Sequence, residues 1–349
     1  MLKSINNYLS TTGKNMRRSA IREILKHLQK PGMISFAGGL PAPETFPVND
    51  LKEITLEILE KNGPDGLQYG STEGDPNLRK MLVSRHNEQG LNISIDNLII
   101  TTGSQQGLDL IARIFLDPGD YVLCGLPYPA GITLPNSRRV KIIEIADKYD
   151  LLIVEDCPYR EVRFEGESQK LMNELDTTGR VITLCTFSKI LAPGFRIGWV
   201  IGHPELLDRI VMAKQTADLC TSPFLQKIIA LYIEKGLLDK NLKKTIDLYR
   251  KRRTHMINCF MKYMPDKITW TTPQGGLFLF VTLPVNLDAD IIFKESLEKN
   301  VAFVSGSTFF CNNSGHNTMR LNFSYSNNDE IELGVKKLAE VITQEQTKK

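Results

Sequence analysis

A single lysine stands at the end of an apolar run in the stretch CTFSKILAPGFRIGWV, residues 185–200. Ser188 precedes this lysine, Lys189, and Arg196 follows it seven positions later. A lysine at a strand end usually lays its stem along apolar surface and keeps its charged amine in water. Desolvation would instead favour the neutral amine, which is the form that attacks an aldehyde to give an imine. The stretch therefore indicates either a solvated side chain or an imine-forming lysine.

A second strand end carries groups that could bind an anion. In TTGSQQG, a strand leads into a helix through Gly103, Ser104 and Gln105. Free backbone N–H groups at a helix start, together with the serine hydroxyl, suit a phosphate. The alternative is that Ser104 is an ordinary N-cap with no ligand. Both interpretations place a turn at the carboxyl end of the strand.

A third strand end carries carboxylates. The stretch LLIVEDCPYR ends its apolar run in Glu155 and Asp156, and Tyr159 follows three residues later. A carboxylate in that position caps a helix or meets a buried cation. In open α/β sheets, ligands gather outside the carboxyl ends of the strands. We therefore expect all three strand ends to contribute to one site.

These groups together suit one cofactor, pyridoxal phosphate. The lysine would form the Schiff base, the aspartate would keep the pyridine nitrogen protonated, and the N–H groups with the arginine would hold the phosphate. The combination is more specific than any of its parts. We therefore expect a pyridoxal-phosphate site built on the strand ends.

The elements that position these residues follow from the hydrophobic pattern. Between residues 97 and 202, short apolar strands alternate with amphipathic helices, which predicts an α/β fold with a mainly parallel sheet covered by helices. One of these expected strands is DYVLCGLP, residues 120–127. The later part of the chain is first helical and then mixed, which predicts a smaller α+β domain. We expect an N-terminal helix and arm that packs with the small domain at 1–47, a large cofactor domain at 48–235, and the small domain at 236–349.

Composition limits the class of protein. The 349 residues carry a net charge of +3 and no basic stripe, which argues against nucleic acid as a partner. Six scattered cysteines without a CxxC pair argue against a metal site and disulfides and favour a cytoplasmic protein. No apolar run is long enough to cross a membrane. The basic, acid-free first twenty residues leave a transit peptide as an alternative.

With these residues, the chain resembles the class I/II, fold type I, pyridoxal-phosphate-dependent aminotransferases. It is most similar to the branch with 2-aminoadipate and kynurenine/aminoadipate aminotransferases and the catalytic domains of MocR-type regulators. The resemblance runs from the N-terminal region to the C-terminus in the family's order. The matching stretches include ISFAGGLPAPETFP, LQYGSTEGDPNLRK, IITTGSQQGLDLIARIFLDPGD, YDLLIVEDCPYREVRFEG, TFSKILAPGFRIGW, TPQGGLFLFVTLP and MRLNFSYSN.

The resemblance implies a role for each matching residue. Lys189 would bind the cofactor and move the substrate proton, Asp156 would pair with the ring nitrogen, and Tyr159 would bond the ring oxygen. Arg320 would clamp the substrate α-carboxylate, with Gly39 nearby. Phosphate binding would fall to Gly103, Ser104, Gln105, Ser188, Arg196 and, from the partner subunit of a homodimer, Tyr69.

One segment departs from the family. GLPYPAGITLPNSRR, residues 125–139, is shorter than the family's corresponding region, and Tyr128 stands where the family has an asparagine that bonds the ring. Either Tyr128 is the family's ring-stacking residue and the asparagine is lost, or the segment replaces a later strand and the stacking residue is lost. The intervening strand would lie in the middle of the family's sheet.

The expected activity is transfer of an amino group between an α-amino acid and a 2-oxo acid, with 2-oxoglutarate as acceptor. A different class of function is a shortened, catalytically weak or silent protein that acts as a dimer partner. β-Elimination and decarboxylation remain open on the same cofactor. A MocR-type regulator is disfavoured, because the residues before the domain cannot hold a winged helix-turn-helix.

Overall fold

A computed structural model describes residues 5–16, 31–125 and 131–348, and the chain forms two compact units. The large unit comprises residues 41–254 and 272–277. The small unit comprises 1–40, 255–271 and 278–349. The chain passes from one unit to the other inside a long helix, α10 (Leu237–Tyr263), whereas the sequence analysis put that boundary at residue 236. The N-terminal helix expected around residues 21–30 lies outside the described residues.

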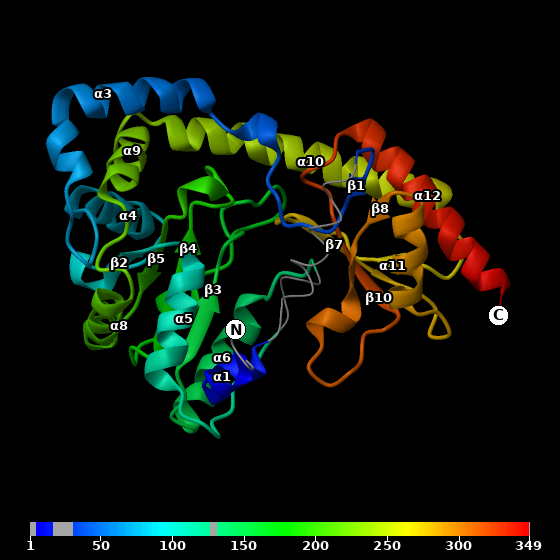
Figure 1. Cartoon of the computed structure of the whole chain (residues 1–349), viewed down its shortest axis with the longest axis horizontal. Helices are drawn as coiled ribbons and strands as arrows, with labels where there is room; N and C mark the ends of the chain where they lie inside the picture. The colour runs from blue at the N-terminus through cyan, green and yellow to red at the C-terminus, as the bar shows by residue number, and fades with distance from the viewer. Residues whose placement is uncertain (1–4, 17–30, 126–130, 349) are drawn as a thin grey trace. The chain divides into compact units, whose positions relative to one another are not determined.

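The large unit is built on a four-stranded sheet in the order β2 (Leu98–Thr101), β5 (Gly198–Ile201), β4 (Val181–Thr186), β3 (Ile153–Asp156) (Figure 1). The strands β3 and β4 pair in parallel, and β5 pairs antiparallel with both β4 and β2. The α/β fold is as expected, but the sheet is mixed. The reason is the connection between β4 and β5, which is too short for a crossover and turns the chain back on itself.

The large unit contains α3 (Val48–Leu67), α4 (Pro76–Glu88), α5 (Ser104–Phe115), α6 (Asn136–Lys148), α7 (Met172–Leu175), α8 (Pro204–Ala217) and α9 (Pro223–Glu234). Helices α4, α5, α7 and α8 of the large unit contact the strands of its sheet. One core cluster joins the sheet to α5 and α8 through residues such as Leu110, Leu184 and Ile210. A Cβ atom at Gly107 would come within 2.8 Å of Leu184, so α5 lies close against the sheet there.

The strand expected at 120–127 does not form in the described residues. Residues 121–125 have no regular secondary structure and are exposed, and 126–127 lie outside the described part. The exposed fraction is 95% for Tyr121 and 86% for Leu123. A strand needs a neighbour for its backbone N–H and C=O groups. Because this segment has none among the described residues, β3 is the last described strand on its side of the sheet.

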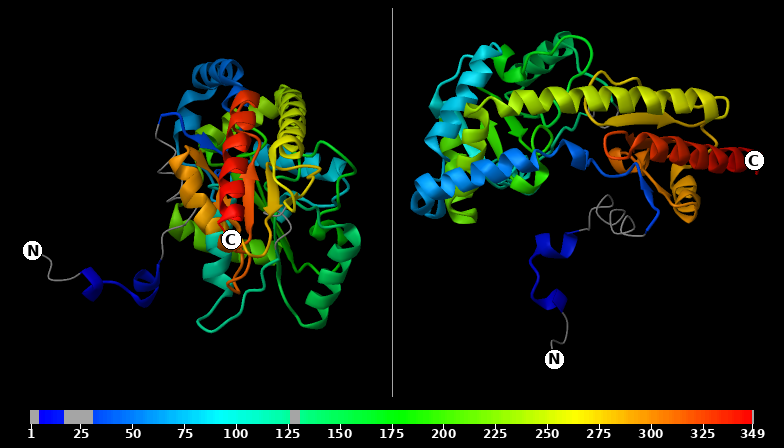
Figure 2. Two further views of the ribbon diagram at one scale, coloured as in Figure 1. Left: turned by 90° about the vertical axis from the view of Figure 1, so that its right-hand side faces the viewer. Right: turned by 90° about the horizontal axis from the view of Figure 1, so that it is seen from above.

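The small unit is α+β, as expected. Its antiparallel sheet has the order β6 (Thr269–Trp270), β7 (Phe278–Thr282), β10 (Thr318–Asn322), β9 (Val304–Ser305). A short parallel pair joins β1 (Ile34–Ser35) to β8 (Val301–Ala302). The helices α11 (Ala289–Glu298) and α12 (Asn328–Thr347) lie side by side (Figure 2).

The shorter helical pieces are α1 (Thr11–Asn15) and five single turns of 3₁₀ helix. These turns are Ile5–Asn7, Pro43–Thr45, Ile95–Asn97, Pro193–Phe195 and Gly306–Phe309. None of the described helices has both the length and the apolar character needed to span a membrane.

Candidate active site

The turn between β2 and α5 is built around Gly103. Its φ of +74° is a conformation that glycine adopts without strain, and it ends β2 just before α5 begins at Ser104. A Cβ atom at Gly103 would lie 2.6 Å from Nη2 of Arg196, so the two residues are in contact. The register pairs Thr101 with Gly198, which brings the turns of β2 and β5 together. The arginine predicted to bind phosphate therefore lies over the predicted phosphate turn.

The turn after β4 joins the same cluster. Ser188 is buried, its N–H donates to Oγ1 of Thr186 at 3.1 Å, and Nη1 of Arg196 lies 3.4 Å from its hydroxyl oxygen. Ser104 is half-buried at the first position of α5, and Gln105 beside it is exposed. A helix N-terminus, a hydroxyl and a guanidinium in one place form a site for a phosphate dianion. The donor set thus fits the phosphate of the expected cofactor.

Lys189 and Asp156 lie at the same end of neighbouring strands. Asp156 is the last residue of β3 and pairs in register with Leu184 of β4, while half-buried Lys189 lies in the turn that follows β4. Because β3 and β4 are parallel, both residues belong to the carboxyl edge of the sheet. This is the edge at which open α/β sheets bind ligands.

The carboxyl group of Asp156 is electrostatically unusual. The residue is exposed on the open side of β3, yet protein atoms around the carboxyl displace solvating water and raise its pKa to about 6. Desolvation disfavours the charged carboxylate, and a cation beside it would restore that form. A protonated pyridine nitrogen is such a cation, so this position also fits the expected cofactor.

The neighbouring Glu155 has a different, structural role. It is buried, pairs with Arg139, and its Oε2 accepts the N–H of Met172 at 2.8 Å at the start of α7. Both sequence-based readings of a strand-end carboxylate, a helix cap and a partner for a buried cation, are thus met by Glu155. Glu155, and not Asp156, makes these two contacts.

Two of the three tyrosines predicted to bind the cofactor lie among the described residues. Tyr159 is half-buried and begins a turn in which the N–H of Val162 donates to its carbonyl oxygen at 3.0 Å. Tyr69, on the segment before α4, is 78% exposed. Tyr128 lies outside the described residues.

The predicted substrate residues belong to the small unit. Arg320 on β10 is buried, with its guanidinium carbon 3.9 Å from the ring centre of Phe278 and 4.7 Å from that of Phe309. Its Nη2 donates to the carbonyl oxygen of Ala37 at 3.3 Å. Half-buried Gly39 is two residues beyond Ala37, so Arg320 lies beside the loop that carries Gly39. Stacking on aromatic rings fixes the plane of a guanidinium, which favours two-pronged binding of a carboxylate.

A polar network behind the phosphate turn was missed by the sequence analysis. Lys214 is fully buried on α8, and its Nζ donates to Oδ1 of Asp218 at 2.6 Å. The other carboxylate oxygen of Asp218 accepts the hydroxyl of Thr102 at 2.8 Å, and the N–H of Thr102 donates to Oε1 of Gln106 at 2.8 Å. Thr102 and Gln106 flank the turn at 103–105. A lysine with an aspartate four positions later was the available signal, but this spacing is also typical of exposed helix pairs.

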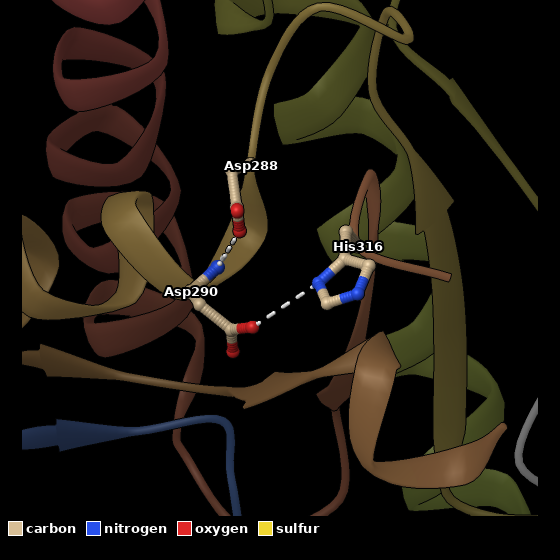
Figure 3. A group of neighbouring side chains, drawn as sticks. All are labelled: Asp288, Asp290 and His316. Carbon is tan, nitrogen blue, oxygen red and sulfur yellow. Dashed lines mark hydrogen bonds and ion pairs between the residues drawn. The ribbon is translucent and has the colours of Figure 1, made fainter. Parts of the chain in front are cut away.

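A further group of polar side chains lies in the small unit. Asp288 caps α11 by accepting the N–H of Asp290 at 2.8 Å, and Nδ1 of His316 lies 3.5 Å from Oδ2 of Asp290 (Figure 3). Nε2 of His316 is 3.1 Å from the carbonyl oxygen of Asn313. The three side chains could present ligand atoms to a metal ion. A helix cap and an ion pair account for their arrangement within the protein itself.

Comparison with known proteins identifies the class to which this site belongs. The chain matches the family described as aminotransferase class I and II over residues 31–128 and 123–338. It is 40% identical to aromatic-amino-acid aminotransferase 1 of Thermococcus litoralis, over 98% of this chain and 95% of that protein. It is 33% identical to 2-aminoadipate transaminase of Thermus thermophilus, over 94% of each. Kynurenine aminotransferase of Pyrococcus horikoshii, solved with PMP, has a TM-score of 0.93 at 38% identity and covers 99% of both chains.

The chain therefore belongs to the aminotransferase class I and II family, as its motifs predicted. It has the fold of the fold type I enzymes, it is an aminotransferase, and its cofactor is pyridoxal phosphate. The relatives give no support to the alternative of a catalytically silent dimer partner.

The departure from the family falls at one place in the chain. The two matched segments overlap at residues 123–128, so this stretch aligns with two parts of the family pattern. The alignment with the Thermococcus litoralis enzyme spans 397 positions, although this chain has 349 residues. The relative thus carries residues that this chain lacks. The overlap coincides with the expected strand that does not form.

Proposed function

We propose that this aminotransferase moves an amino group from an α-amino acid to 2-oxoglutarate, with Lys189 as the residue that binds the cofactor covalently. The observation that carries the proposal is the meeting of three turns at the carboxyl edge of the sheet. Gly103, Ser188 and Arg196 are in contact there, and Lys189 and Asp156 follow neighbouring parallel strands.

The chain's residues would divide the work as follows. The turn at 103–105, Ser188 and Arg196 would hold the phosphate, the carboxylate of Asp156 would pair with the protonated ring nitrogen, and Tyr159 would bond the ring oxygen. Bound in this way, pyridoxal phosphate supplies an electron sink for the substrate's Cα. Lys189, as a free amine, would hold and move the proton at the substrate's Cα. Arg320 orients the substrate through its carboxylate, beside the loop of Gly39.

The proposed cofactor site also bears on the oligomeric state and on the choice of amino-acid donor. We propose a homodimer in which exposed Tyr69 of one copy contacts the phosphate at the other's site. The relatives' names, an aromatic-amino-acid aminotransferase and a 2-aminoadipate transaminase, define the first donors to test. The free state of all six cysteines supports a reducing compartment such as the cytoplasm.

An absorbance titration tests the proposal. Wild-type protein with pyridoxal phosphate is expected to show a visible band that is bleached by an amino-acid donor and restored by 2-oxoglutarate. Lys189→Ala should lose the band, while Lys240→Ala, a change at an exposed lysine, should keep it. A band that persists in Lys189→Ala would contradict the role of this lysine. A band that no donor bleaches would contradict transamination.

A further inference from the structure

The strand β3 has an open edge among the described residues. The N–H of Ile153 donates to the carbonyl of Arg180 at 3.0 Å, and the N–H of Cys157 donates to that of Leu184 at 2.8 Å. Successive residues of a parallel strand direct their backbone groups to alternate sides. The groups of Leu152, Val154 and Asp156 therefore face away from β4.

This edge has the properties of a pairing surface. Leu152 is 43% and Val154 is 40% exposed, and residues 151–156 contain neither proline nor lysine. Proline and lysine are two of the means by which proteins block an open edge. A row of outward backbone groups flanked by exposed apolar side chains is a template for another strand.

A second segment has strand-forming residues and no partner strand. Tyr121–Gly125 combines aromatic and β-branched side chains, and Tyr121, Val122 and Leu123 are 95%, 61% and 86% exposed. No hydrogen bond joins it to another segment among the described residues. It therefore lacks the neighbour that its composition favours.

Both features belong to the part of the chain where the family match breaks. Exposed large apolar side chains are dense between residues 116 and 154, and the doubly matched stretch 123–128 lies within this interval. The alignment with the Thermococcus litoralis relative is longer than this chain. Apolar surface of this extent on a folded protein marks an interaction site.

We propose that the segment Tyr121–Gly125 of a second copy of this chain pairs with the outer edge of β3. The exchange is reciprocal, because each copy has the outer edge of β3 to offer and one segment to donate, which satisfies two-fold symmetry. The described structure does not pair the segment with its own β3.

Charge selects the direction of pairing. Asp120 precedes the segment and Asp156 ends β3. An antiparallel arrangement brings these two carboxylates to the same end, where like charges oppose pairing. A parallel arrangement separates them and places Leu123 beside Val154. The parallel arrangement brings Asp120 near Asp150 instead, but Asp150 already has Arg180 as an ion-pair partner at 3.5 Å. The proposed pairing is therefore parallel, continuing the direction of β3 and β4.

Disulfide trapping between two different variants tests the contact. The background replaces the two exposed cysteines, Cys124→Ser and Cys311→Ser. One preparation then carries Leu123→Cys and the other Val154→Cys. Mixed and mildly oxidised, they are expected to give a covalent dimer whose 123–154 link is identified by peptide mapping. Its yield should exceed that of Leu123→Cys mixed with Val285→Cys, a 93% exposed site elsewhere, by at least tenfold.

The mapped 123–154 link distinguishes this strand pairing from the homodimer proposed through Tyr69. The mass of the assembly alone would not, because both contacts give a dimer. A third preparation carries both Leu123→Cys and Val154→Cys, and linkage only within one chain of it would mean that the segment closes its own edge. Linkage of Val154→Cys with itself would mean that two β3 edges meet directly. Either result, or no 123–154 link in the mixture, overturns the proposal.

Hydrogen exchange on the wild-type chain supplies a measurement without substitutions. The amides of 121–125 and of Leu152, Val154 and Asp156 are expected to become protected together as protein concentration rises. Amides that exchange equally fast at all concentrations would contradict the pairing. Protection that is independent of concentration would place the partner strand within the same chain.

Discussion

The charged form of Asp156 destabilises the cofactor-free protein, although the proposed function needs this charge at the site. Its pKa of about 6 exceeds the usual value of 3.8 because the protein displaces water from the carboxyl group. The folded state thus binds this proton more tightly than the unfolded state. The associated stability is complete below pH 3.8 and is lost as the pH rises through 6.

Replacing this carboxyl group with an amide should therefore have a pH-dependent effect. Asp156→Asn is expected to raise the stability of the cofactor-free protein at pH 8 and to change it little at pH 4. The measurement is urea unfolding of both proteins at the two pH values. With pyridoxal phosphate added, the order at pH 8 should reverse, because an amide cannot neutralise the ring nitrogen. An equal difference at both pH values would mean that the carboxyl group is not desolvated.

The stability contributed by His86 has the opposite pH dependence to that of Asp156. It is buried, and Nε1 of Trp199 donates to its Nε2 at 3.0 Å, which requires that nitrogen to be unprotonated. Desolvation lowers its pKa from 6.5 to about 4. Because the folded-state pKa is depressed, the stability is present above pH 6.5 and is lost as the pH falls towards 4, at a cost on the order of 3 kcal/mol.

A variant that keeps an acceptor without titrating isolates this contribution. His86→Gln is expected to flatten the fall in unfolding free energy between pH 7 and pH 4. Urea unfolding followed by tryptophan fluorescence measures it. A variant whose stability falls as steeply as that of the wild type would assign the acid sensitivity to other groups.

At the scale of elements, the Lys214–Asp218 pair links α8 to the phosphate turn. Lys214 is fully buried, so removal of Asp218 leaves a charge without its counter-ion. We expect Asp218→Ala to destabilise the protein by about 3 kcal/mol. It should also weaken pyridoxal-phosphate binding, because Thr102 loses the acceptor that holds the turn.

An exposed pair of the same spacing provides the control. Asp109→Ala breaks the ion pair with Arg113 on α5, and is expected to change stability by less than about 1 kcal/mol and cofactor affinity not at all. Urea unfolding and a cofactor titration measure both quantities. If Asp218→Ala behaves like Asp109→Ala, the network does not position the turn.

For most helices and strands, the hydrophobic pattern of the local sequence was enough to predict the element. The helix expected after the turn at 103–105 forms at Ser104–Phe115, and the alternation of strands and helices expected between residues 97 and 202 is present. The direction of β5 could not be read from its own residues. This strand runs antiparallel to β2 and β4 because the connection between β4 and β5 is too short for a crossover. The strand at 120–127 failed for a related reason. Its composition favours a strand, but the described sheet provides it no neighbour.

For the whole molecule, the predicted residues are divided between the two units. The residues proposed to contact the phosphate and the ring belong to the large unit, and Arg320 belongs to the small one. Arg320→Lys should therefore leave cofactor binding intact and raise the KM for the amino-acid donor roughly 10- to 100-fold, the loss of one or two charge-assisted hydrogen bonds. Steady-state kinetics with a parallel cofactor titration measure the two effects. A loss of cofactor affinity equal to the change in KM would contradict this division of roles.

The sequence by itself determined the chemistry and the class of protein. Lys189, Asp156 and the turn at 103–105 each follow an apolar strand, and residue type together with strand-end position is information that the chain carries locally. Only the tertiary structure decided which of these groups meet, because contact depends on strand order and direction. It placed Arg196 over Gly103, gave Glu155 rather than Asp156 a buried cation, and revealed the network of Lys214. It also left β3 as an open edge, since pairing requires a neighbour that no local pattern can supply.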